Sequence, residues 1–61
     1  MTINDIETGV QLKLGGVDGV VDWVGSDKFR FKYADPNSGY FVKDYYLFTD
    51  LDKFTKVVQI K

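Results

Sequence analysis

The stretch that decides the fold is Lys28-Phe29-Arg30-Phe31-Lys32-Tyr33, in which basic residues alternate with aromatic ones. Successive side chains of a β-strand point to opposite faces of the sheet, so this alternation is typical of a half-buried strand. We expect Phe29, Phe31 and Tyr33 to face the core and the cations between them to face solvent. A shift of the strand pairing by one residue would bury those cations, so the register of this strand is strongly specified.

Outward from this strand, clusters of turn-forming residues divide the chain into short runs rich in valine and aromatic residues, which is the composition of strands. The expected strands are Gly9–Leu14, Gly19–Val24, Lys28–Tyr33, Tyr40–Tyr46 and Thr55–Ile60. The second strand has apolar groups on both faces, as a central or strongly bent strand does, and we expect its Asp22 to lie at a wet end. The Asp35–Gly39 loop makes the third and fourth strands an ordinary hairpin.

Two segments outside these strands have helical features. Leu47, Leu51 and Phe54 recur at helical spacing over a stretch that is short for an α-helix, so we expect a single 3₁₀ or α turn before the last strand. Near the start of the chain, the Ile3–Glu7 segment fits either a frayed strand or one helical turn, and the sequence leaves both open.

The length of 61 residues sets a single domain, residues 1–61. So short a chain buries only about 60% of its unfolded surface, which leaves a thin margin of stability. Cysteine and histidine are both absent, so neither a disulfide nor the usual zinc ligands can stabilise the fold. The content of 44% hydrophobic and 16% aromatic residues is enough to build a core from side chains alone.

The succession of TGVQLKLGG, DGVVDWV, KFRFKYAD, GYFVKDYYL and DLDKFTKV resembles the small SH3-like barrel over residues Thr8–Val58. That class has a glycine-led first strand, a Gly-Val-Val second strand, a basic-aromatic third strand, a short turn and a closing strand. The resemblance implies an all-β fold, a small five-stranded antiparallel SH3-like barrel with one short helical turn before the last strand. An OB-like barrel is usually longer, and a β-sandwich needs more strands than this length allows.

The signalling SH3 domains differ from this chain at their peptide groove, where they have an Ala-Leu-Tyr-Asp-Tyr type of motif and paired tryptophans. Here Trp23 is the single tryptophan, and Asp44-Tyr45-Tyr46 stands at a different place in the strand order. We therefore do not expect binding of proline-rich peptides. The start at Met1 and the small size fit a complete gene product, of the kind often found among bacterial or phage accessory proteins.

The net charge of -1 comes from nine acidic and eight basic residues, so no overall charge favours nucleic acid or an anionic membrane. The N-terminal MTINDIETG lacks the basic and apolar regions of a secretory signal. The longest apolar run, Tyr45–Phe48, is far shorter than a membrane span. We expect a soluble cytoplasmic protein with no membrane partner.

The residue types present favour a protein that is not an enzyme. Without histidine and cysteine, most pairs of a nucleophile and a base cannot be built. The Asp35–Gly39 loop begins like a calcium loop, but Gly39 falls one position early and no Glu follows at the twelfth place. The aspartates that remain as paired carboxylates, Asp18, Asp22, Asp50 and Asp52, suit turns, caps and solvent. We expect no catalytic residues, no cofactor and no metal site.

An excess of aromatic residues predicts a binding surface. The chain has ten aromatic side chains, whereas a core of this size encloses about six or seven on the burial expected of so short a chain. Tyrosine and tryptophan carry a polar atom and suit partial exposure. The candidate partner-binding residues are Trp23, Tyr40, Tyr45 and Tyr46. They predict a module that binds a protein partner, or a second copy of itself, through exposed rings; the alternative is that these rings cap the ends of the barrel.

A basic stripe predicts a second, different partner. Lys28, Arg30 and Lys32, with Lys43 across the hairpin, would form a surface that follows phosphates, and an exposed tyrosine beside it would stack on bases of single-stranded nucleic acid. The alternative is a solvated strand face, where lysines deter edge-to-edge aggregation. Asp44 is close enough in sequence to neutralise part of the stripe.

Overall fold

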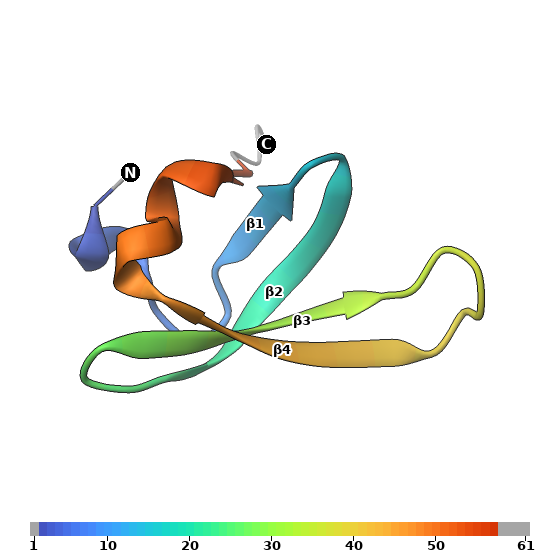
Figure 1. Ribbon diagram of the computed structural model, residues 1–61, viewed down its shortest axis with the longest axis horizontal. Coiled ribbons are helices and arrows are strands. Elements are labelled where there is room, and N and C mark those ends of the chain that lie inside the picture. Colours follow the sequence, from blue (N-terminus) through green and yellow to red (C-terminus); the bar gives the residue numbers. More distant parts are fainter. Residues whose placement is uncertain (1, 58–61) are drawn as a thin grey trace.

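The strands form one antiparallel sheet in the order β4-β3-β2-β1-β5 in the computed structural model, which describes residues 2–57 (Figure 1). The elements along the chain are η1 (Ile3–Asp5), β1 (Gln11–Leu14), β2 (Val17–Val24), β3 (Lys28–Ala34), β4 (Phe41–Leu47), η2 (Phe48–Lys53) and β5 (Phe54–Lys56). The prediction of an all-β chain with five antiparallel strands and a short 3₁₀ turn before the last is confirmed. The predicted strand Thr55–Ile60 corresponds to β5 in part, and its positions 58–60 lie outside the described residues.

The Ile3–Glu7 segment, which the sequence left open, contains the 3₁₀ turn η1. Two hydrogen bonds join the ends of this turn: the carboxylate of Asp5 accepts one from the backbone N–H of Thr2 at 2.9 Å, and the Asp5 N–H donates one to the backbone oxygen of Thr2 at 2.9 Å. Ile6 follows this turn and is buried, so η1 places one apolar side chain over the core.

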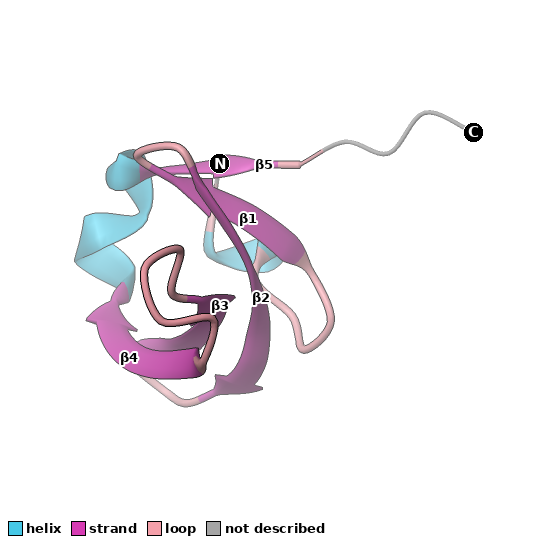
Figure 2. Ribbon diagram, turned by 90° about the vertical axis from the view of Figure 1, so that its right-hand side faces the viewer, coloured by secondary structure: helices cyan, strands magenta, loops and turns pink. Residues whose placement is uncertain are grey.

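The long strand β2 joins the two halves of the sheet. Its first half pairs with β1 and its second half with β3, so β2 is a central strand, as its apolar residues on both faces predicted. Figure 2 shows β2 curving from the β1–β5 pair to the β3–β4 pair, with η2 on the opposite side. Among residues 2–57 no ladder joins β4 to β5, so hydrogen bonds do not close the sheet into a barrel.

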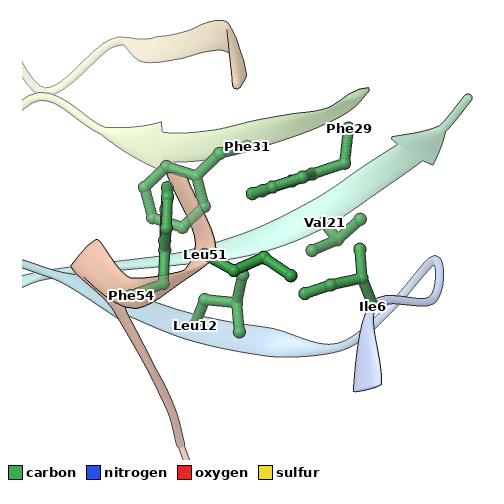
Figure 3. Close-up of a cluster of buried hydrophobic side chains, with 7 residues drawn as sticks. All are labelled: Ile6, Leu12, Val21, Phe29, Phe31, Leu51 and Phe54. Atoms are coloured by element: carbon green, nitrogen blue, oxygen red, sulfur yellow. The ribbon is translucent and has the colours of Figure 1, made fainter. Parts of the chain in front are cut away.

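The core lies inside this curved sheet and is centred on the aromatic face of β3. Phe29 and Phe31 are fully buried, as predicted, and Tyr33 is half-buried. The ring of Phe31 meets Phe54 of β5 at 5.3 Å between centroids, in an edge-to-face contact. The buried cluster that Figure 3 shows consists of Ile6, Leu12, Val21, Phe29, Phe31, Leu51 and Phe54.

Gly19 allows the large ring of Phe31 to lie against β2. A Cβ atom at this position would come within 2.5 Å of both the Phe31 ring and the backbone oxygen of Lys32. The Gly15-Gly16 pair has another role, because both residues have positive φ in the two-residue turn between β1 and β2. Such turns match the twist of the strands that they join.

Candidate binding surface

The pairing of β3 with β4 sets which side chains share the surface opposite the core. Arg30 lies across from Tyr45, and Lys32 lies across from Lys43. Because directly paired residues point to the same side, these residues share one surface. We call this surface the outer face and define it by the residues Asp22, Trp23, Lys28, Arg30, Lys32, Phe41, Lys43, Tyr45 and Leu47.

A β-bulge in β2 brings two side chains to the same point of the outer face. The register shifts between Val21, which pairs with Phe31, and Trp23, which pairs with Arg30. The extra residue is Asp22, and a bulge of this kind re-aims side chains at the site where it occurs. Asp22 was predicted to lie at a wet end of this strand. It lies instead inside the strand, half-buried, against Arg30.

The Asp22 carboxylate holds two cations of the outer face. Arg30 donates its Nε–H to Oδ1 at 2.6 Å, and Nζ of Lys43 lies 3.6 Å from Oδ2. The hydrogen bond from Arg30 is the main reason that the pKa of Asp22 lies below its ordinary value, and the same pair raises the pKa of Arg30. Asp22 is therefore ionised at neutral pH and fixes Arg30 against the sheet.

Cations lie over two of the exposed rings. Lys28 Nζ is 5.3 Å and the Arg30 guanidinium is 6.0 Å from the centre of the Tyr45 ring, while Lys32 Nζ is 4.7 Å from the centre of the Phe41 ring. Exposed contacts of this type stabilise by about 0.5–1 kcal/mol each. The edge of Trp23 meets Tyr45 at 5.8 Å, so the rings and the cations form one continuous surface.

The charge of the outer face is opposite in sign to that of the chain. It carries the four cations Lys28, Arg30, Lys32 and Lys43 against the single carboxylate of Asp22, whereas the chain has a net charge of -1. Asp44, which was expected to neutralise part of the stripe, lies on the core side of β4. There it accepts a hydrogen bond from the Tyr33 hydroxyl at 3.0 Å, and this bond is the main reason that the pKa of Tyr33 is raised.

The structure separates the four predicted partner-binding rings. Trp23 (39% exposed) and Tyr45 (57%) lie together on the outer face, and Tyr40 (77%) precedes β4 beside the hairpin loop. Tyr46 points to the core side of β4, where its ring is 5.0 Å from that of Phe54, so it does not belong to an exposed aromatic surface. The cations predicted as an alternative site, Lys28, Arg30, Lys32 and Lys43, are all brought together.

Sequence reasoning missed Phe41, Leu47 and Asp22 as members of the outer face. Phe41 is 69% exposed, and it was not among the rings expected at the surface. The hairpin contained a signal, since Val42 and Tyr46 can face the core only if Phe41 and Tyr45 face outward. No comparable pattern in the sequence indicates the bulge at Asp22.

An open groove of about 400 Å³ extends the outer face toward β1. Its lining includes Lys32 and Phe41 of the outer face and Val20 of β2. Asp18 also lines the groove and adds a negative charge to it.

Within residues 2–57 there is no group of three or more Asp, Glu, His or Cys side chains that could hold a metal ion. In the same part of the chain, no helix has the length and apolar character needed to cross a membrane. Comparison of the chain with protein-family models, with curated proteins and with solved structures finds no significant match.

Proposed function

We propose that this chain is a non-enzymatic interaction module that uses its outer face to bind a negatively charged partner. The observation that carries this proposal is the gathering of four cations and three exposed rings on one face of a chain that is slightly acidic overall. Local potentials of this kind attract partners of the opposite sign, whatever the net charge of the protein.

The finer fold that goes with this function is an SH3-like barrel left open between β4 and β5. Its support is the return of β5 to pair with β1 and the 3₁₀ turn η2 directly before that last strand. In this arrangement the outer face belongs to β2, β3 and β4, and the core is on the other side. The binding surface is therefore exposed without any rearrangement of the fold.

The sequence favoured a protein partner, or a second copy of the chain, bound through aromatic rings. The geometry adds a requirement to that reading, because Tyr45 and Phe41 each have a cation over the ring. A partner that covers these rings must also accept the positive charges beside them. A neutral apolar surface would desolvate the cations without pairing them, which is costly.

Retention on immobilised heparin, a polyanion, tests this function with two matched variants. The double variant Lys28→Glu/Lys32→Glu changes the outer face, whereas Lys13→Glu/Lys53→Glu makes the same change in net charge at exposed positions elsewhere. We expect the native chain and the second variant to be retained at low salt and the first variant to flow through. Equal behaviour of the two variants, with both folded by circular dichroism, would overturn the proposal.

A further inference from the structure

The cations of the outer face are arranged in a row and not in a cluster. Lys28, Arg30 and Lys32 occupy alternate positions of β3, so neighbouring cations are about 6.6 Å apart along the strand and the row is about 13 Å long. Lys43 stands beside Lys32 on β4. A row of this kind can follow the phosphates along a nucleic-acid backbone.

The exposed rings form a second row beside the first. Tyr45 and Phe41 are four residues apart on β4 and point to the same side, which separates them by about 14 Å. Trp23 extends this surface by its edge contact with Tyr45. A row of cations next to a row of rings can hold phosphates and bases of the same strand at once, since each base offers a face that stacks on an aromatic ring.

The composition of the surface favours nucleic acid over a protein partner. Three of the four cations are lysines, and lysine is depleted in the interiors of protein interfaces. Lysine is, by contrast, a common phosphate ligand. A duplex fits less well than a single strand, because its bases are stacked on one another and cannot reach Tyr45 or Phe41.

We propose, on the basis of the function proposed above, that the outer face binds single-stranded nucleic acid, with phosphates along β3 and bases stacked on Tyr45 and Phe41. Asp22 keeps Arg30 in this row through the 2.6 Å hydrogen bond. Asp18, in the groove beyond Lys32, would repel a phosphate and sets the end of the row. DNA and RNA both have the phosphates and bases that this surface would recognise, so the test includes a single strand of each.

Fluorescence anisotropy with labelled homopolymers tests this proposal on the full 61-residue chain. The probes are oligothymidylate and oligouridylate of about ten nucleotides, a DNA duplex of the same length, and a polyglutamate peptide of similar charge. We expect one or both single strands to bind more tightly than the duplex and the peptide. Log K should fall linearly with log salt, with a slope of roughly -2 to -3 for contacts from four cations.

Two variants separate the contribution of the rings from that of the charges. Tyr45→Ala should weaken binding about tenfold or more without a change in the salt slope, and Tyr45→Phe should retain binding because the ring remains. Lys32→Ala should make the slope shallower by about 0.7. Tyr40→Ala is the matched control for the ring, since Tyr40 is exposed but lies outside the outer face, and it should bind as the native chain does.

The outcomes distinguish this proposal from the function on which it rests. If polyglutamate binds as tightly as the single strands, single-stranded nucleic acid is not the ligand, and if Tyr45→Ala binds normally, bases do not stack on Tyr45. Either result overturns this proposal, while the anionic partner proposed above is retained. Binding of the duplex as tight as that of the single strands would also exclude stacking on the rings. If none of the polyanions binds, both proposals are overturned.

Discussion

Asp22 pairs with two cations of the outer face, Arg30 and Lys43, and its ionisation links that surface to the stability of the fold. In the unfolded chain an aspartate has a pKa of about 3.9. The hydrogen bond from Arg30 lowers the pKa of Asp22 in the folded chain. A lowered folded-state pKa stabilises the fold above the unfolded value, and this stabilisation is lost as the pH falls through the folded value. We therefore predict that Asp22→Asn lowers the melting temperature at pH 7.

The lowered pKa of Asp22 also predicts how the decrease in melting temperature caused by Asp22→Asn depends on pH. The difference in melting temperature between the native chain and Asp22→Asn should shrink as the pH is taken below about 4. Thermal unfolding followed by circular dichroism from pH 7 to pH 3 measures it. Asp52→Asn, an exposed carboxylate on η2, is the control and should melt like the native chain at pH 7. A difference that stays constant over this range would contradict the role of Asp22.

Phe31 and Arg30 are neighbours on β3 with different surroundings, and truncating them should destabilise the fold to very different extents. Phe31 is fully buried among rings, so Phe31→Ala should cost about 3–5 kcal/mol in the free energy of unfolding. Such a loss is a large share of the stability of so small a domain. Arg30→Ala removes a partly exposed pair and should cost much less. Urea unfolding compares the two, and equal losses would mean that the two faces of β3 are assigned wrongly.

Gly19 in β2 and Gly25 directly after it provide a matched pair for testing how closely the chain approaches its neighbours at each point. At Gly19 a new Cβ would meet the Lys32 backbone oxygen at 2.5 Å, and a backbone atom inside a sheet cannot move aside. Gly19→Ala should therefore destabilise the fold by about 1–3 kcal/mol. At Gly25 the obstacle is the exposed ring of Trp23, which can rotate away. Gly25→Ala should thus unfold at nearly the native urea concentration and change the fluorescence of Trp23.

The strands were predictable because their residues alternate with a period of two, most clearly in Lys28–Tyr33. The membership of the outer face was predictable only in part. Its β3 cations follow from that same alternation, but Tyr46 was expected to be exposed and instead faces the core, because the pairing of β3 with β4 depends on the geometry of the hairpin loop. The bulge at Asp22 is a product of packing between strands, and local sequence patterns do not reveal it.

For the chain as a whole, the lack of hydrogen bonds between β4 and β5 among residues 2–57 means that packing holds the two ends of the sheet together. The rings of Tyr46 and Phe54 supply one such contact, at 5.0 Å between β4 and β5. Tyr46 thus has a structural part in the fold, in contrast to Tyr45 beside it. The sequence predicted five antiparallel strands, whereas the approach of β4 to β5 depends on these side-chain contacts.

The separation of charge between the outer face and the remainder of the chain also has a kinetic consequence. Beyond a Debye length of about 10 Å at 0.1 M salt, a polyanion meets little more than the small net charge of -1 and is not steered toward the protein. Association should then proceed at an ordinary rate of about 10⁵–10⁷ M⁻¹s⁻¹, because encounters succeed only when the outer face is already turned toward the ligand. Added salt should act mainly by shortening the lifetime of the complex, and stopped-flow measurements of the two rate constants would show whether it does.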